Sequence, residues 1–522
     1  MGRSRSGTSR AEVLAALSLA VDLGLGLPME HMLRATLLAT GLARRLGLDE
    51  RAQATVYYAT QVTWIGCHAD SREVADWFGD DIAFRRDTYD VDWSGLPFLR
   101  LLVSRAGRGH PPVTRAARAA AMLVAPRARL RDLIQSHCAS ASALARRAGL
   151  GDAVSEALRF AFERWDGGGL PGGAAREQVP IEMRVVHLAE TAEVYLHRSG
   201  VADALAMVRA RSGTQFDPAV VAAFAAGAAE LAEEAAAEDV WRAALDRAPE
   251  RGAAGELTED ELDELLEAVG DFADLKRPAA TGHSRAVAAL AAGAAQSLGL
   301  DAAEIRLVRR AGLVHDLGRM GVSNGIWEKP GPLSDSERER VRLYPYLTSR
   351  ILGRVPALRE VATVAGAHQE RLDGTGYPHG LDAVSLRRPQ RLLAAADVYV
   401  GLREDRHYRP AMSADDAARR LREEARAARL DADAVRAVLE AAGARVSRRG
   451  HWPDGITARE ADVLRMVASG QPNATIAAAL HITEKTVRNH VQHIYTKIGV
   501  SNRTGASLYA LSHGILPAPL AE

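Results

Sequence analysis

A regular spacing of apolar residues near the C-terminal end of the chain predicts an amphipathic helix. Val487, Val491, Ile494 and Ile498 follow one another at intervals of four, three and four residues, which places them on one helix face. Thr483 precedes them and is a residue type that caps helix N-termini. The opposite face carries polar side chains, namely Lys485, Arg488, Asn489, Gln492, His493 and Thr496. Such a face suits contact with phosphates and base edges in a DNA major groove.

Two shorter helices are predicted before this one. Thr457 and Glu460 form a capping box pattern, Gly470 ends the helix that they begin, and "NATIAAALHI" reads as a short second helix. The preceding stretch "ARVSRRGHWPDG" mixes Arg, Gly and Pro without an apolar period, which is typical of a tether. The end of the chain is therefore expected to be a small helical domain on a linker.

The rest of the chain repeats itself. "HMLRATLLATGLARRLGLD" from His31 resembles "HSRAVAALAAGAAQSLGLD" from His283, at an offset of 252 residues. Further on, "FERWDGGGLPGG" resembles "QERLDGTGYPHG" at an offset of 207. The smaller offset predicts an insertion of about 45 residues in the first copy, between Cys67 and His137, as a surface loop plus a helix.

These patterns predict an all-α protein with two tandem helical domains and a C-terminal four-helix domain. Between the copies, Thr258 and Glu261 form a capping box pattern before a connector helix that Pro278 stops. The expected parts are a first repeat (1–235), connector helices (236–278), a second repeat (279–443), a linker (444–455) and the C-terminal domain (456–518).

Composition and charge narrow the class of protein. The 522 residues are 47% hydrophobic, and 66 Lys and Arg balance 66 Asp and Glu, so any basic surface must be local. Residues 456–516 hold six Lys and Arg against three Asp and Glu. The two cysteines make no disulfide framework, and Glu12 and Asp22 interrupt the apolar start of the chain. We expect a cytoplasmic protein with no membrane segment.

The stretch "LVHDLGRMGV" places His315 and Asp316 side by side in an otherwise apolar segment. Burying a carboxylate beside an imidazole is costly unless both are paired, and one divalent cation satisfies both. The same repeat also contains His283, His368 in "GAHQERLDG" and Asp397 in "LLAAADVYV". Imidazole and carboxylate together suit a transition metal such as Fe, Mn or Zn.

This order of motifs resembles the HD phosphohydrolase superfamily over about residues 280–440. With "ERLDGTGYPHGL" it looks specifically like an HD-GYP domain, whose known members hydrolyse cyclic di-GMP. The resemblance implies one divalent metal and, if the site is active, catalytic roles for Asp316 and for Arg319, which stands where the family has Lys. The metal ligands that it implies are His283, His315, Asp316, His368 and Asp397.

The second repeat lacks several ligands of longer family sites. Ala279, Tyr344 and Gln369 stand where further ligands would be, so a mononuclear site is expected. The first repeat departs more strongly, with Thr63, Trp64, Ala161 and Glu190 in place of the ligands, although His31 and His137 remain. Trp64 is expected to fill the hole, which leaves a catalytically silent partner or a small-molecule pocket, a nucleotide being one candidate ligand.

The C-terminal segment resembles the LuxR-type helix-turn-helix over its whole length, including "KIGVSNRTGA". The resemblance implies binding to double-stranded DNA as a homodimer. It assigns base contacts to Arg488, Asn489 and Gln492, and backbone contacts to Lys485, Thr486 and Lys497.

Two functions remain open from the sequence. One is a transcription regulator whose HD repeats bind a metal or ligand, and the other is a metal-dependent phosphohydrolase tethered to a DNA-binding domain. Metal content and turnover of cyclic di-GMP would separate them.

Overall fold

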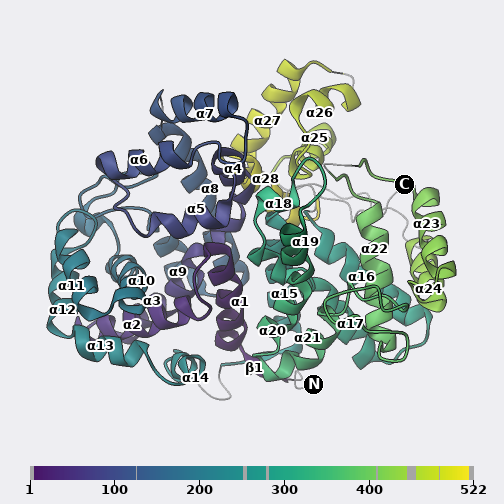
Figure 1. Ribbon diagram of the computed structural model, residues 1–522, viewed down its shortest axis with the longest axis horizontal. Helices are drawn as coiled ribbons and strands as arrows, with labels where there is room; N and C mark the ends of the chain where they lie inside the picture. Colours follow the sequence, from purple (N-terminus) through teal and green to yellow (C-terminus); the bar gives the residue numbers. More distant parts are fainter. Residues whose placement is uncertain are drawn as a thin grey trace. The chain divides into compact units, whose positions relative to one another are not determined.

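Within the residues that the structure describes, the regular elements are helices and one small antiparallel sheet (Figure 1), in agreement with the predicted all-α class. The computed structural model describes residues 5–124, 126–250, 255–277, 281–406, 409–443, 454–480 and 482–515. Strands β1 and β2 pair Arg5 with Thr258 and Ser9 with Glu256. Ala279 and most of the expected linker lie outside the described residues.

The chain forms two compact units, one of Met1–Leu262 with Ser323–Gly325 and one of Asp263–Val322 with Ile326–Glu522. The elements of the first unit, with η marking 3-10 turns, are β1 (Arg5–Ser9), α1 (Arg10–Leu25), α2 (His31–Arg45), α3 (Glu50–Val62), η1 (Thr63–His68), α4 (Ser71–Phe78), α5 (Asp81–Thr88), α6 (Gly95–Arg105), α7 (Pro112–Val124), α8 (Pro126–Arg147), α9 (Gly151–Ala157), η2 (Leu158–Phe160), η3 (Arg176–Gln178), α10 (Ile181–Ser199), α11 (Val201–Ala210), α12 (Pro218–Ala226), α13 (Ala228–Ala235), α14 (Val240–Leu245) and β2 (Glu256–Thr258).

The second unit begins within α15 and includes the C-terminal helices. Its elements are α15 (Glu259–Leu275), α16 (His283–Ser297), α17 (Ala302–Val314), η6 (Leu317–Gly321), α18 (Asn324–Trp327), α19 (Asp335–Arg342), α20 (Tyr344–Leu352), η7 (Pro356–Leu358), α21 (Arg359–Ala365), α22 (Arg388–Leu402), α23 (Ala414–Arg426), α24 (Ala432–Gly443), α25 (Ala458–Ala468), α26 (Asn473–Leu480), α27 (Glu484–Ile498) and α28 (Arg503–Ser512).

The internal repeat is visible in the helix boundaries. Helices α2 and α3 coincide residue for residue with α16 and α17 at the offset of 252. Asp49 and Asp301, which are equivalent at this offset, cap α3 and α17 through bonds from backbone N–H groups. Helices α10 and α22 both begin at the offset of 207. The repeat predicted from the sequence is therefore a structural repeat.

Helix α15 packs as the first helix of the second repeat. Its Asp274 accepts bonds from the Ser284 N–H at 3.0 Å and from the Ser284 hydroxyl at 2.7 Å. In the first repeat the equivalent Asp22 on α1 accepts a bond from the Met32 N–H at 3.0 Å. The capping box at Thr258 is present, but the helix that it begins, expected as a connector, is the counterpart of α1.

The insertion in the first repeat is more structured than a loop and one helix. It forms α4 to α7 and the start of α8. These helices share an apolar cluster that includes Val74, Phe78, Phe84, Leu102 and Leu130. The inserted helices therefore have an apolar cluster of their own within the first unit.

The C-terminal helices α25 to α28 have their own core. Val487 and Ile494 are buried in it, and Val491 and Ile498 pack against it, which confirms the predicted stripe. The Thr457 to Glu460 capping box is present, and Thr483 caps α27 by accepting from the Thr486 N–H at 3.2 Å.

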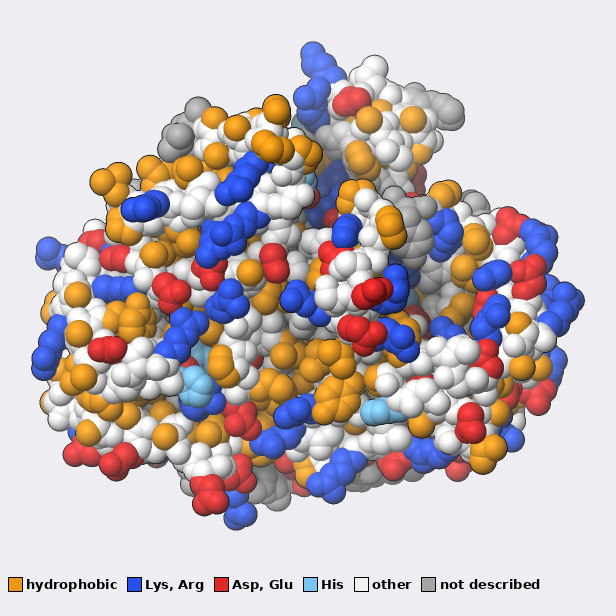
Figure 2. Space-filling view, in the orientation of Figure 1, with side chains coloured by type: hydrophobic (Ala, Val, Ile, Leu, Met, Phe, Trp, Pro, Cys, Tyr) orange, Lys and Arg blue, Asp and Glu red, His pale blue; other side chains and the backbone are white. Residues whose placement is uncertain are grey.

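The surface carries mixed charge. Figure 2 shows Lys and Arg interspersed with Asp and Glu over the visible face, as expected from the equal numbers of the two. Among the described residues, no helix is long and apolar enough to cross a membrane.

Candidate metal centre and DNA-binding surface

The end of α17 brings His315 and Asp316 against the start of α16. Gly312 makes this approach possible, because a Cβ at this position would lie 2.6 Å from the Ala288 Cα. His283, the first residue of α16, is fully buried beside His315. Two helices that are separate in sequence thus place their imidazoles together.

Two of the imidazoles are oriented by backbone carbonyls. His315 Nδ1 lies 2.9 Å from the Gly312 carbonyl oxygen, and His368 Nδ1 lies 2.6 Å from that of Ala365. Each Nδ1–H therefore donates to the backbone, and the Nε2 of each ring is left to face the cluster. Nδ1 bonds of this kind fix the tautomer of histidines that bind metals through Nε2.

His283 is oriented by a carboxylate. Its Nδ1 lies 2.7 Å from Glu404 Oε1, and Arg406 in turn donates to Glu404 Oε2 at 3.0 Å. Glu404 is thus positioned by an ion pair of its own, and His283 Nε2 is aimed away from it. A carboxylate behind a histidine raises the basicity of a metal ligand.

The free ring nitrogens converge with two carboxylates. His283 Nε2 lies 3.3 Å from His315 Nε2, 3.2 Å from Asp397 Oδ1 and 3.6 Å from Asp316 Oδ2. His315 Nε2 lies 3.6 Å from Asp397 Oδ1. Asp316 Oδ1 is buried and accepts no well-directed hydrogen bond among the described residues. Lone pairs gathered at such distances suit one divalent cation.

Tyr344 and Gln369 form hydrogen bonds to two atoms, His368 Nε2 and Asp397 Oδ2, that could otherwise bind a metal ion. The Tyr344 hydroxyl donates to His368 Nε2 at 2.6 Å, while burial and the neighbouring His315 lower the pKa of His368 to about 4. The Gln369 amide donates to Asp397 Oδ2 at 2.8 Å, so that Oδ1 remains for a cation. Four of the predicted ligands are thus open to a cation, and His368 lies beside them with its lone pair engaged.

The carboxylates hold a proton on the cluster in the absence of metal. Although burial favours a neutral ring, Glu404 and Asp397 raise the pKa of His283 to about 10. Despite its burial, Asp316 has a pKa of about 2, because Arg319 and the imidazoles stabilise its charged form. The proton on His283 therefore stands where a metal ion would bind.

Cations surround the acidic side of the cluster. Arg319 Nε lies 2.9 Å from Asp316 Oδ1, and its guanidinium stacks over the Trp327 ring at 4.9 Å. A small cavity beside Asp316 is lined by Arg319 and Arg277. Burial, together with the neighbouring Arg406 and Arg319, lowers the pKa of Arg277 to about 9. This cavity has a volume of only about 10 Å³. It is the size of one water molecule.

In the first repeat, Trp64 stands at the position of Asp316, but the hole that it was expected to fill remains as a cavity that Trp64 lines. Its ring contacts Phe162 edge to face, with centroids 5.2 Å apart, and the His137 ring at 5.8 Å. His137 Nε2 lies 2.7 Å from the carbonyl oxygen of Thr63, so it bonds to the backbone.

Two carboxylates of the first repeat are engaged by neighbouring side chains. His31 Nδ1 bonds to Glu193, and Glu190 accepts from the Tyr89 hydroxyl. Ala161, at the position of His368, has no side-chain atom that could bind a metal ion. Within the described residues, the groups with metal-ligand spacing all belong to the second repeat.

Helix α27 presents the polar face that its sequence predicted. Lys485, Arg488, Asn489 and Gln492 are exposed, and Thr486 is partly buried. Lys497 is exposed, but its ammonium donates to Glu460 Oε2 at 2.7 Å and to the Gly455 carbonyl at 2.9 Å. A phosphate contact at Lys497 would require these bonds to open.

Sequence reasoning missed Glu404. It lies seven residues after Asp397 and two residues beyond the end of α22, at the start of the stretch "EDRHYRPAMS". A carboxylate at this spacing was the available signal, and only its bond to His283 distinguishes it from a surface residue.

Two family models match the chain, an HD domain over residues 267–434 and bacterial regulatory proteins of the luxR family over residues 454–510. The 3'3'-cGAMP-specific phosphodiesterase 3 of Vibrio cholerae serotype O1 is 29% identical over 418 residues, 78% of this chain and 89% of that protein. A cyclic di-GMP phosphodiesterase of Pseudomonas aeruginosa is 41% identical over 144 residues, 27% of this chain and 34% of that protein.

A solved structure shares the fold over most of the chain. The crystal structure of a cyclic GMP-AMP specific phosphodiesterase of Vibrio cholerae superposes with a TM-score of 0.57 and 25% identity. The superposition covers 85% of this chain and 99% of that one. Taken with the two family matches, these findings show that the chain carries an HD domain followed by a C-terminal domain of the luxR regulatory family.

Proposed function

We propose that the protein is a DNA-binding transcription regulator whose second repeat holds one divalent metal ion and acts as its sensory module. The observation that carries the proposal is the convergence of His283, His315, Asp316 and Asp397 in a chain that ends in a luxR-type domain. A domain of this family implies DNA binding. The ion would supply positive charge and Lewis-acid chemistry at the cluster.

The donor set points to a transition metal such as Fe, Mn or Zn. Two neutral imidazoles and two carboxylates match the ligand preference of these ions better than that of Ca²⁺ or Mg²⁺, which favour oxygen alone. The cavity of about 10 Å³ beside Asp316 has room for one water molecule.

Elemental analysis of the full-length protein, purified without chelator and then loaded with Fe, Mn or Zn, tests the metal centre. About one equivalent of metal is expected in the wild type, and little in a His315→Ala, Asp316→Ala double variant. Asp335→Ala serves as the matched control, because this carboxylate is exposed. Equal and negligible metal in the wild type and the double variant would show that the site is vestigial.

In the DNA-binding domain we propose base contacts for Arg488, Asn489 and Gln492. We propose contacts with the DNA backbone for Lys485, Thr486 and Lys497. The domain would bind as a homodimer, since a two-fold symmetric protein reads two half-sites related by a dyad.

Hydrolysis of a cyclic dinucleotide is the second candidate function. It is favoured by the relatives, which include enzymes named for 3'3'-cGAMP and for cyclic di-GMP. In such a reaction Asp316 and Arg319 would be the catalytic residues. The bonds from Tyr344 to His368 and from Gln369 to Asp397 argue for weak activity, since both engage ligand atoms.

Turnover of both cyclic dinucleotides by metal-loaded protein separates the two functions. We expect a rate below the ordinary range of enzymes, which begins at about 1 s⁻¹. A rate above that value, abolished by Asp316→Ala, would make catalysis the main activity.

A further inference from the structure

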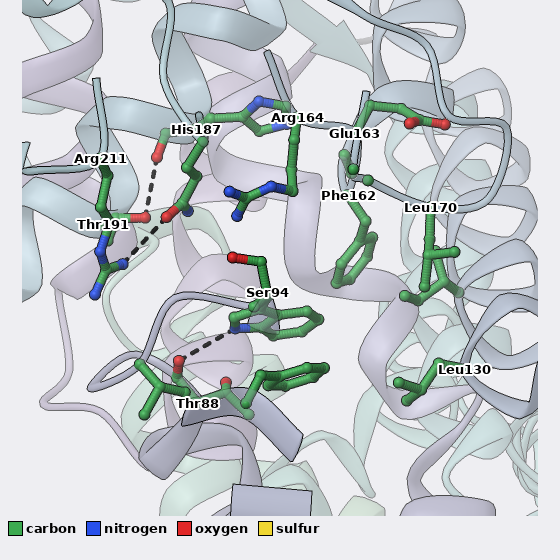
Figure 3. Close-up of a pocket in the computed structure, with 18 of the residues that line it drawn as sticks. Thr88, Ser94, Leu130, Phe162, Glu163, Arg164, Leu170, His187, Thr191 and Arg211 are labelled. Atoms are coloured by element: carbon green, nitrogen blue, oxygen red, sulfur yellow. Dashed lines mark hydrogen bonds between the residues drawn. The ribbon is translucent and has the colours of Figure 1, made fainter. Parts of the chain in front are cut away.

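The first repeat contains a cavity of about 360 Å³ where the second repeat has its metal centre (Figure 3). Its lining includes Trp64, Ala161 and Glu190, which stand at the positions of Asp316, His368 and Asp397. The volume lies at the lower end of the range of about 300–1,000 Å³ that small-molecule sites occupy. The cavity has room for one ring system with a substituent.

Four aromatic rings form much of its wall. The inserted segment contributes Trp93 and Phe98, which stack with centroids 5.4 Å apart and planes 11° from parallel. Trp93 is held by a bond from its Nε1–H to the Thr88 carbonyl at 3.1 Å. Trp64 and Phe162 meet edge to face on the repeat itself. Rings fixed in this way favour a flat partner.

Arg211 supplies the positive charge of the cavity. Its guanidinium donates to Gln215 Oε1 at 3.2 Å and to the Tyr195 hydroxyl at 3.3 Å, and both partners are neutral. No carboxylate within the described part of the chain forms an ion pair with it. Arg164, by contrast, is paired with Asp92 and Asp166. A partly buried cation with only neutral partners gains most from an anionic ligand.

The two kinds of wall lie on different sides of the cavity. In Figure 3, Phe162, Leu170 and Leu130 lie on one side, and Thr191 and Arg211 lie on the other. A ligand that matches both sides has an apolar ring at one end and an anionic group at the other.

We propose that this cavity is an effector site for a small flat aromatic molecule that carries one anionic group, such as a purine nucleoside monophosphate. The ring packs among Trp64, Trp93 and Phe162, and Arg211 binds the anionic group. The binding stands independently of the metal centre, whereas the effector role rests on the proposed regulatory function.

Titration of the full-length protein with GMP, guanosine and ribose 5-phosphate tests the ligand chemistry. Tryptophan fluorescence is the readout, because Trp64 and Trp93 line the cavity, and calorimetry gives the stoichiometry. We expect saturable quenching by GMP at one site per chain, binding at least about tenfold weaker for guanosine, and no quenching by ribose 5-phosphate. Anilinonaphthalene sulfonate serves as a flat anion that is not a nucleotide. Absence of saturable binding by both GMP and this probe at millimolar concentration would overturn the proposal.

Arg211→Gln locates the site. It keeps hydrogen-bonding capacity but removes the charge, so GMP affinity should fall about tenfold, while Arg211→Lys should retain the preference for GMP over guanosine. Arg209→Gln, an exposed arginine two residues earlier on α11, is the matched control. Unchanged GMP binding by folded Arg211→Gln would overturn the assignment. Asp316→Ala should leave GMP binding intact, so loss of this site and loss of the metal centre are separate outcomes.

Discussion

Glu404 decides which nitrogen of His283 faces the cluster. It fixes the Nδ1–H and thereby aims Nε2 at His315 and Asp397. We predict that Glu404→Gln lowers the metal affinity of the second repeat by about 10–100-fold, the usual effect of losing such a partner. Competition with a chelator of known affinity measures this change. Glu360→Gln, which alters an exposed carboxylate, is the control, and equal affinity in the two variants would contradict the role of Glu404.

Metal binding at this cluster is predicted to release protons. The pKa of His283 is about 10 without metal, so the ring is charged at neutral pH and must lose its proton before Nε2 can bind a cation. Apparent affinity should therefore rise with pH between about 6 and 10. Calorimetry at pH 7.5 in buffers of different ionisation enthalpy should show about one proton released per metal. A binding enthalpy that does not depend on the buffer would contradict this protonation state.

The sequence was sufficient to predict which ionisable residues gather in the second repeat but not their partners. His283, His315, Asp316 and Asp397 lie in recognisable motifs, and the structure brings their side chains together. That His368 would be tied to the Tyr344 hydroxyl depends on the packing of α20 against the end of α21, which no local pattern encodes. Hydrogen bonds of this kind decide how many of the candidate ligand atoms are available to a metal ion, and only the structure shows them.

Helix α27 shows how far an element can be predicted. Its cap, its apolar stripe and its exposed face all follow from helical spacing, because one helix face must cover the small core. The bond from Lys497 to Glu460 does not follow, since it joins α27 to the cap of α25. The inserted helices α4 to α7 were also underestimated, because their short segments bury much of their apolar surface in a cluster that they share.

Substitutions on the exposed face of α27 are predicted to distinguish residues that contact bases from residues that contact phosphates. Arg488→Ala should cost about 1–3 kcal/mol at the preferred duplex and relax discrimination there, since a bidentate base contact is lost. Lys485→Ala should weaken all duplexes alike and reduce the salt slope by about one unit, as expected for a phosphate contact. Both side chains are exposed, so circular dichroism should show intact folds. Unchanged binding by folded Arg488→Ala, or a wild type without preference over random duplex, would identify α27 as a protein-binding surface instead.

On the scale of the whole molecule, the two repeats share one helical arrangement but differ in the side chains at the equivalent site. Helices α2 and α3 repeat as α16 and α17 at an offset of 252, yet one copy gathers side chains with metal-ligand spacing and the other has an aromatic cavity. The chain balances 66 basic against 66 acidic residues, so its DNA binding must come from the local charge of the C-terminal domain. A regulator of this kind requires that the state of the repeats alters the affinity of that domain for DNA.

The affinity of the full-length protein for its selected duplex, measured with and without bound metal at one salt concentration, tests this account most directly. We predict a difference of at least about fivefold, which corresponds to about 1 kcal/mol of coupling. The His315→Ala, Asp316→Ala variant should bind the duplex with one affinity whether or not metal is added. Equal affinity of metal-loaded and metal-free wild type, with one metal bound per chain, would contradict the claim that the HD domain is the sensor of a DNA-binding regulator.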